Sequence, residues 1–243
     1  SIIINNLFGV DIMEEAVEIC KLRLFLKLVA QVETIDQIEP LPDIDFNIRA
    51  GNTLVGFATL DDVRKAMEGR LDFDNAVKRI EEEAELVERA FNQFRAQQTA
   101  HGGRVTVQDK QELRERLRNL TDQLDRFLGA EYGISESKYR SPTAYEEAFS
   151  KWKASHQPFH WFAEYYGIMR AGGFDVVIGN PPYVEYSKVK KQYTVLGYAT
   201  EQCGNLYAFV MERNAILAHA SGRSGMIVPH SSICTDRMAP VQS

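Results

Sequence analysis

A charged segment with a heptad pattern occupies the middle of the sequence and limits how the rest can fold. Of the 80 residues from 61 to 140, 32 are charged, against 30 of the other 163. Apolar residues recur there at alternating spacings of three and four, in two series: Val77, Ile80, Ala84, Val87, Phe91 and Phe94, then Leu113, Leu117, Leu120, Leu124 and Phe127. Such a series forms one apolar stripe along a helix that packs against another helix. The segment therefore predicts an antiparallel helical hairpin.

Local signals mark the turn of this hairpin. His101-Gly102-Gly103 separates the two series, and glycine pairs interrupt helices. Thr106, followed three residues later by Asp109, resembles a capping box at the start of the second helix. We interpret the hairpin as an insertion that serves as a structural arm or spacer. The alternative is a role in DNA contact or domain docking.

Strands and helices alternate on both sides of the hairpin. Before it, the pattern predicts a strand ended by Asp11, a helix and a second strand, at residues 7–10, 12–32 and 46–49. After it, the pattern predicts a strand, a helix ended by Gly222 and a second strand, at residues 174–179, 205–220 and 225–229. Strand–helix–strand repeats predict α/β layers with a parallel sheet. The expected parts are a first core part, a helical insertion and a second core part, at residues 1–60, 61–158 and 159–243.

The segment that leads back from the hairpin is rich in aromatic residues. They are Tyr145, Phe149, Trp152, Phe159, Trp161, Phe162, Tyr165 and Tyr166. Aromatic side chains interleaved with lysine and histidine can stack on nucleic-acid bases. More often they pack an insertion back onto its parent domain, and we favour that interpretation.

Composition limits the partners and the compartment. The 243 residues carry a net charge of −6, and a chain that grips nucleic acid by itself usually has a basic face or total. No apolar run approaches the roughly 18 residues that a membrane helix needs, and the start lacks the features of a signal peptide. Cys20, Cys203 and Cys234 form no CxxC pair. We expect buried thiols in a reducing, cytoplasmic setting.

The sharpest signal is Asn180-Pro181-Pro182-Tyr183, directly after a predicted strand, where open α/β sheets bind ligands. An exocyclic base amine is a poor nucleophile because its lone pair is delocalised into the ring. The Asn180 side-chain oxygen and the Pro181 carbonyl can each accept one N–H and direct that lone pair toward an electrophile. Two prolines restrict the direction of the carbonyl, and Tyr183 offers a face for a planar substrate. The competing interpretation is a simple turn.

Two further polar residues follow predicted strands. Asp11 lies between a strand and a helix, where nucleotide-binding folds hold ribose hydroxyls, although a helix-capping aspartate looks the same. Asn52 lies in the turn Ala50-Gly51-Asn52-Thr53, and its amide could read the edge of an adenine. Each is weak evidence alone.

Taken in order, these blocks resemble the amino-methyltransferases of restriction–modification systems. The blocks are GVDI, AVEICKLRLFLKL, NIRAGNTLVG, FDVVIGNPPYV, GNLYAFVMERNAIL and GMIVPHSSI. The chain is most similar to type II (type IIG-like) N6-adenine DNA methyltransferases, including phage-defence methylases. The resemblance covers roughly residues 5–59 and 172–234 and excludes the helical insertion.

The resemblance implies a Rossmann-like, S-adenosylmethionine-dependent methyltransferase fold with the helical hairpin inserted. In the cofactor site, Asp11 would bind the ribose hydroxyls, Ile12 would pack on the cofactor adenine, and Asn52 would bond that adenine's amino edge. No metal is implied. The expected setting is the cytoplasm of a bacterium or archaeon.

The resemblance also implies that the methyl group moves to N6 of adenine by direct displacement, with no covalent enzyme intermediate. Asn180 and Pro181, supported by Pro182, would bond the target amine, and Tyr183 would stack on the flipped adenine. A neighbouring block, Asn205, Leu206 and Tyr207, matches a region near the target pocket. The partner would be double-stranded DNA, with a specificity domain or subunit as a further partner.

The sequence departs from the family pattern at both ends. The glycine-rich loop that cradles the methionine part of the cofactor is absent from these 243 residues, and so is a target recognition domain. We expect the 243 residues alone to bind the cofactor poorly and to methylate nothing. Two alternatives remain open: a methyltransferase acting on protein glutamine or structural RNA, and a non-catalytic scaffold module of the same fold.

Overall fold

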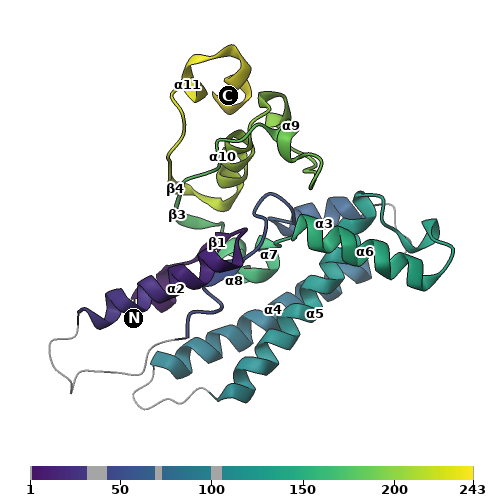
Figure 1. Ribbon diagram of the computed structural model, residues 1–243. Helices are drawn as coiled ribbons and strands as arrows, with labels where there is room; N and C mark the ends of the chain where they lie inside the picture. The colour runs from purple at the N-terminus through teal and green to yellow at the C-terminus, as the bar shows by residue number, and fades with distance from the viewer. Residues whose placement is uncertain (1, 32–42, 69–72, 100–105, 243) are drawn as a thin grey trace.

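The computed structural model describes residues 2–31, 43–68, 73–99 and 106–242 (Figure 1). Its larger helices and its strands, in chain order, are α1 (Ile2–Asn6), β1 (Gly9–Asp11), α2 (Glu14–Val29), β2 (Ile48–Ala50), α3 (Leu60–Met67), α4 (Phe73–Thr99), α5 (Val107–Glu131), α6 (Pro142–His156), α7 (Trp161–Glu164), α8 (Tyr166–Arg170), β3 (Phe174–Gly179), α9 (Tyr186–Val189), α10 (Leu206–Leu217), β4 (Ala218–Met226), α11 (Ser231–Cys234) and α12 (Ala239–Gln242). Short 3-10 helices lie at Glu136–Lys138, Ala199–Cys203 and Asp236–Met238.

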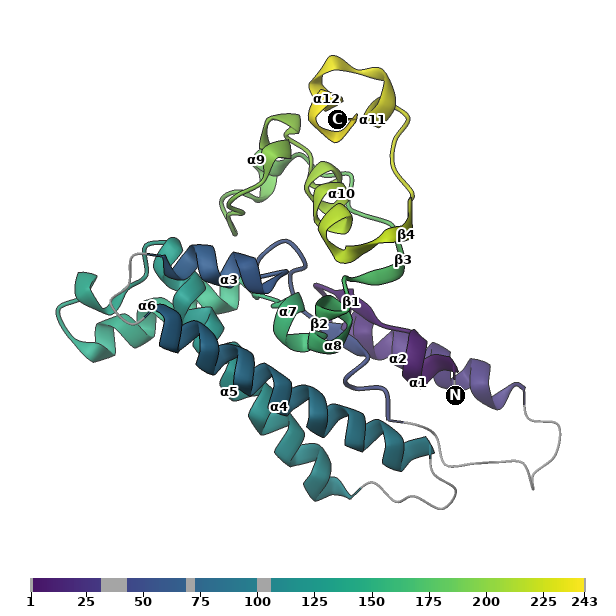
Figure 2. The same ribbon diagram turned by 180° about the vertical axis from the view of Figure 1, so that it is seen from behind.

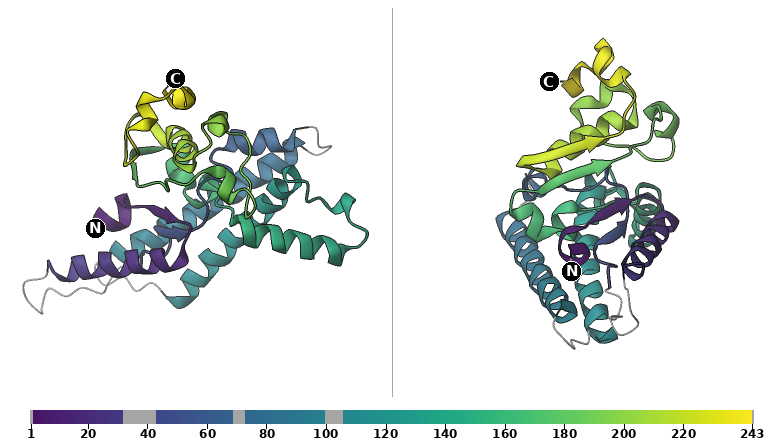
Figure 3. Two further views of the ribbon diagram at one scale, coloured as in Figure 1. Left: turned by 45° about the horizontal axis from the view of Figure 1, so that its top comes forward. Right: turned by 90° about the vertical axis from the view of Figure 1, so that its left-hand side faces the viewer.

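The described strands form two separate parallel pairs. β1 pairs with β2 around the crossover helix α2, and β3 pairs with β4 around α10. In the right-hand view of Figure 3, the β3–β4 pair lies above the β1–β2 pair. The mixed α/β class is thus confirmed. The single Rossmann-like sheet stays a prediction, because no hydrogen-bonded ladder joins the two pairs among the described residues.

Two sequence boundaries in the last unit were wrong. The helix expected to end at Gly222 ends at Leu217, and the strand expected at residues 225–229 begins at Ala218 and ends at Met226. Gly173 has φ +111, and a Cβ there would lie 2.4 Å from the carbonyl oxygen of Leu217. This close approach lets β3 begin pairing directly where α10 ends, so the chain leaves the helix one turn early.

The predicted hairpin is present as α4 and α5. Nine of its eleven seam residues are buried in one hydrophobic core, and the other two, Phe91 and Phe127, are partly buried and pack against it. The capping box at Thr106 and Asp109 is confirmed with both reciprocal hydrogen bonds. The expected turn at residues 101–103 lies outside the described residues.

The turn after β2 is where the insertion returns to the core. Phe159 N donates to the Val55 carbonyl at 2.7 Å, and Phe57 N donates to Nδ1 of His160 at 3.1 Å. Gly56 has φ +134, and a Cβ there would lie 2.2 Å from the Phe159 carbonyl oxygen. Since His160 also bonds Asp125 of α5 at 3.0 Å through Nε2, one buried histidine links this turn to the hairpin.

The aromatic residues expected to pack the insertion onto its parent are all buried, as predicted. One hydrophobic core contains Leu54 before the insertion, the hairpin seam, Trp152 of α6 and Phe209 of α10. Figures 1 and 2 show that α9 and α10 lie above the helices α3 to α6 in the views drawn. The domain boundaries at residues 60 and 158 stay predictions, and this core crosses both.

Some apolar and thiol side chains lie outside the core. On α2, only Val17 is buried, while Ile19, Leu22 and Leu26 are more than half exposed. Cys203 is buried as expected, but Cys20 and Cys234 are exposed, so the expectation of buried thiols was wrong for these two. No described helix combines the length and the apolar character that crossing a bilayer requires.

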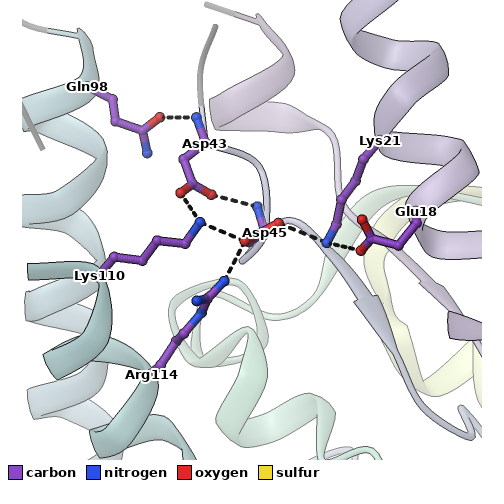
Figure 4. Close-up of polar contacts among 7 residues, drawn as sticks. All are labelled: Glu18, Lys21, Asp43, Asp45, Gln98, Lys110 and Arg114. Carbon is purple, nitrogen blue, oxygen red and sulfur yellow. Dashed lines mark hydrogen bonds and ion pairs between the residues drawn. The ribbon is translucent and has the colours of Figure 1, made fainter. Parts of the chain in front are cut away.

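A cluster of charged residues fastens the turn end of the hairpin, where α4 ends and α5 begins, to the core (Figure 4). Asp45, three residues before β2, accepts from Lys110 at 2.6 Å and from Arg114 at 2.5 Å, both on α5. On its other side Lys21 of α2 lies 2.8 Å away. Asp43 also pairs with Lys110, and its backbone N–H donates to Gln98 of α4; Lys21 pairs with Glu18 as well. Asp45 therefore joins α2 and α5 to the loop before β2, and the neighbouring Asp43 adds α4.

The cationic side chains around Asp45 favour its ionised form. Partial burial raises the pKa of the carboxyl group, but hydrogen bonds and charges from Lys110 and Lys21 outweigh burial and lower the pKa to about 2, from 3.8. A carboxyl group with a lowered pKa in the folded state stabilises that state above its unfolded pKa. This contribution is lost as the pH falls through the folded value.

We predict that Asp45→Asn lowers the free energy of unfolding by about 1–2 kcal/mol at neutral pH, because three cationic partners lose their shared anion. Denaturant unfolding of the full-length protein at a series of pH values measures the effect. The difference from wild type should shrink between about pH 4 and pH 2. Asp61→Asn is the matched control, since Asp61 is an exposed aspartate paired only with Arg64. An equal loss at every pH would contradict the assignment.

Candidate functional site

β3 carries Asn180 to an exposed position at the end of a sheet. The strand ends at Gly179, whose carbonyl accepts a 3.0 Å hydrogen bond from Ile227 N just beyond β4. Asn180 and Pro182 are exposed, whereas Pro181 is buried. The buried Pro181 thus anchors residues 180–183 at the end of the β3–β4 pair, and the amide of Asn180 remains accessible to a ligand.

Tyr183 folds back over the strand end. Its hydroxyl donates to the Ile227 carbonyl at 2.8 Å and lies 3.4 Å from Oδ1 of Asn180. The ring meets Tyr207 edge-on at 6.3 Å between centroids, and the residue is 51% exposed. A half-exposed aromatic ring held at both its hydroxyl and its edge can stack a planar group. The bond to Ile227 was not foreseen in the sequence.

The block around Asn205 lies beside this tetrapeptide. Leu206 N donates to the Val184 carbonyl at 2.9 Å, and Glu185 and Asn205 form an antiparallel bridge. Leu206 and Tyr207 are buried, and Oδ1 of Asn205 is buried with no hydrogen-bond partner. The structure therefore brings this block together with residues 180–183.

The residues assigned to a cofactor gather at the other sheet. Asp11 is exposed at the end of β1, and its Oδ1 accepts from Met13 N at 2.9 Å. Ile12 is 42% exposed. Gly51 N donates to the Asp11 carbonyl at 2.9 Å, which holds the turn containing Asn52 against the same edge. Asp11, Ile12 and Asn52 thus share the carboxyl end of one strand pair.

Asn52 differs from the other two because it is buried, with 3% of its surface exposed. Its Oδ1 accepts from Leu54 N at 3.1 Å, whereas its Nδ2 has no hydrogen-bond partner among the described residues. A buried donor without a partner is costly, so such groups commonly have a functional or structural reason. The donor is therefore consistent with a ligand acceptor reaching this turn.

The two groups of candidate residues lie on neighbouring strand pairs, joined by aromatic packing. Phe8, just before β1, lies 6.0 Å from Phe174 of β3 between ring centroids, and Tyr165 packs against both. Across the described residues, no hydrogen bond joins Asp11 or Asn52 to Asn180 or Tyr183. The structure therefore places the two half-sites on strand pairs that pack together through these aromatic side chains, without linking the half-sites directly.

Arg213 of α10 connects these halves and was missed in the sequence. Its guanidinium donates to the Tyr198 hydroxyl at 2.9 Å, to the Gly56 carbonyl at 3.2 Å and to the Leu54 carbonyl at 3.4 Å. Burial raises the pKa of Tyr198 to about 12, so this hydroxyl stays protonated and donates to the Leu54 carbonyl at 2.9 Å. An arginine within a largely apolar helix was the available signal.

Comparison with known proteins adds an independent observation. Residues 5–239 match a family model described as the Eco57I restriction-modification methylase. This match includes the helical insertion, so the expectation that the resemblance excludes the insertion was wrong. The chain is also 30% identical, over 274 aligned residues, to a Methanocaldococcus jannaschii protein whose name describes a type II restriction enzyme and methyltransferase. That alignment covers 95% of this chain and 22% of the relative, so the chain spans about a fifth of the relative's length. No solved structure matches the chain.

We predict that Arg213→Met destabilises the link between α10 and the turn at residues 54–56 by about 2–4 kcal/mol, because two buried carbonyls lose a charged donor. Hydrogen exchange of the full-length protein, resolved by peptide, should show faster exchange at residues 54–57. Arg223→Met is the matched control, since that exposed guanidinium bonds only the carbonyls of its own turn. Unchanged exchange in the Arg213 variant would show that the link carries little stability.

Proposed function

The chain belongs to the Eco57I restriction-modification methylase family, and we propose that it forms part of a DNA methyltransferase catalytic domain that methylates N6 of adenine. The observation that carries the proposal is the exposed Asn180 amide at the carboxyl end of β3, beside the half-exposed ring of Tyr183. The printed name of the M. jannaschii relative supports methyl transfer in a restriction system.

Asn180 and Pro181 act on the amine of the target base. Oδ1 of Asn180 accepts one N–H of the exocyclic amine, and the Pro181 carbonyl accepts the other. With both hydrogens held, the nitrogen lone pair is directed out of the ring plane and becomes available for attack. The strand end presents these acceptors before the substrate arrives, so they need little reorganisation during the reaction.

Tyr183 receives the planar base. A base that has left the DNA helix loses its stacking partners, and an aromatic ring replaces part of that interaction. The hydrogen bond from the hydroxyl to Ile227 keeps the ring close to Asn180. Stacking and amine binding are therefore contributed by neighbouring residues of one rigid turn.

The residues of the β1–β2 edge suit S-adenosylmethionine as methyl donor. The exposed Asp11 carboxylate can accept from ribose hydroxyls, and the unpartnered Nδ2 of Asn52 can donate to a ring nitrogen of the cofactor adenine. Ile12 presents apolar surface beside them. When bound, this cofactor supplies an electrophilic methyl group on a sulfonium. Asp11, Ile12 and Asn52 hold and orient it.

The decisive experiment is expression of the full-length protein in a bacterial host that lacks adenine methylation, followed by quantification of N6-methyladenine in the DNA. We expect methyladenine with wild type and a loss of roughly 100- to 1,000-fold in kcat with Asn180→Ala, since one acceptor to the reacting amine is removed. Asn92→Ala, at an exposed asparagine of α4, is the matched control and should keep full activity.

Either of two results would overturn the proposal. A soluble protein that binds S-adenosylmethionine yet leaves no methyladenine would favour glutamine or RNA substrates. A full-length protein that binds no cofactor would favour a scaffold.

We predict that substitutions of Tyr183 separate stacking from positioning. Tyr183→Ala removes the ring and should raise KM for DNA by roughly 5- to 150-fold, because base stacking contributes about 1–3 kcal/mol. Tyr183→Phe keeps the ring but loses the bond to Ile227, so its KM should rise by less than about fivefold. Steady-state kinetics on duplex DNA measure both. Equal effects of the two variants would show that the hydroxyl, not the ring, matters.

A further inference from the structure

The chain from residue 184 to residue 200 is basic, although the whole protein is acidic. It carries three lysines, Lys188, Lys190 and Lys191, and one acidic residue, Glu185, whereas the net charge of all 243 residues is −6. This segment begins directly behind Tyr183. A local positive charge beside a base-binding site suits a polyanionic substrate.

The start of this segment is held against the substrate side of the site. Tyr186 N donates to the Gly204 carbonyl at 2.9 Å, just before the Asn205 block. Val195 N donates to the Tyr186 hydroxyl at 2.9 Å, which closes residues 186–195 into a loop. The loop, defined here as residues 186–195, is therefore a built structure and not a free tail.

The helical insertion supports the far side of the same loop. Thr194 N donates to Nε2 of His156 on α6 at 3.1 Å, and the Tyr132 hydroxyl at the end of α5 donates to the Thr194 carbonyl at 3.1 Å. Partial burial lowers the pKa of His156, which favours the neutral ring that can accept this bond. The insertion thus holds in place the loop that follows residues 180–183 in the chain.

Two of the three lysines are available for a partner. Lys190 pairs with Glu201 at 3.4 Å and lies over the ring of Tyr186. Glu185, the acidic residue near Lys188, is itself paired with Arg237 at 2.9 Å. Lys188 and Lys191 are exposed and form no ion pair with any described residue.

We propose that the loop of residues 186–195 is a contact for the DNA phosphate backbone, in which Lys188 and Lys191 bind phosphates flanking the target adenine. This assignment rests on the proposed DNA methyltransferase function. It gives the insertion a role, because Tyr132 and His156 position the loop that follows the base-binding residues. Phosphate contacts of this kind set register and orientation without reading sequence.

The test is the salt dependence of DNA binding by the full-length protein. Fluorescence anisotropy with a short labelled DNA duplex gives Kd at a series of salt concentrations. For Lys188→Gln/Lys191→Gln we expect a weaker Kd, and a slope of log K against log salt that is less steep by about 2, since each lost phosphate contact contributes about 0.9. The loss should be similar for different DNA sequences.

The control pair is Lys65→Gln/Lys151→Gln, two exposed lysines on α3 and α6, which should keep the wild-type slope. Tyr132→Phe tests the support from the insertion and should also flatten the slope and weaken Kd, although no charge is removed. A Tyr132→Phe variant that loses thermal stability but keeps the slope would overturn the positioning role.

The outcomes separate this inference from the proposed function. Wild-type protein that methylates adenine, together with a lysine double variant whose Kd and slope equal those of wild type, would overturn the loop contact and leave the proposed function intact. A wild-type protein that leaves no methyladenine and shows no salt-dependent DNA binding would overturn both. A flattened slope in the lysine double variant, with the slope of the control pair unchanged, supports the contact.

Discussion

The pairing of the turn at residues 51–57 with residues 157–162 is the contact on which the rest of the structure depends. Nearly 100 residues leave the core after this turn and return to it at the same place. The return requires glycine at Gly56, where the Phe159 carbonyl occupies the space a side chain would need. Because Asn52 lies in this turn, closing the insertion also determines where that candidate cofactor residue is held.

Different forces hold the two ends of the insertion. Where the chain enters and leaves the insertion, the seam of α4 and α5 merges with the aromatic residues of α6 and with Phe209 in one core, and buried apolar area is the largest favourable term available to the chain. At the turn end of the hairpin, charges converge on Asp45, and such partly exposed pairs contribute about 1 kcal/mol each or less. Burial of apolar side chains therefore drives the packing of the insertion onto the core, while the ion pairs of Asp45 orient the turn end of the hairpin.

Features specified by local sequence were predictable, and features specified by tertiary contact were not. The seams of α4 and α5, the capping box at Thr106 and the exact span of β3 depend on spacing and short-range bonds. The end of α10 depends on the approach of Gly173 to Leu217, which no local pattern reveals. The burial of Asn52 and the role of Arg213 likewise arise from segments more than 100 residues apart.

The proposed site divides its tasks between elements of different rigidity. The proposed acceptors for the target amine, on Asn180 and Pro181, lie at the end of β3. Pairing with β4 restricts the backbone conformation there, and catalysis requires precise placement of such groups. Charged contacts to a phosphate chain tolerate more movement. The proposed contacts lie on the loop of residues 186–195, and the Tyr132 hydroxyl and the His156 imidazole of the insertion hold this loop in place through Thr194. Arg213 joins α10, which follows this loop, to the turn that contains Asn52. A shift of the insertion, which lies within the residues that the family model matches, would therefore be transmitted to both half-sites.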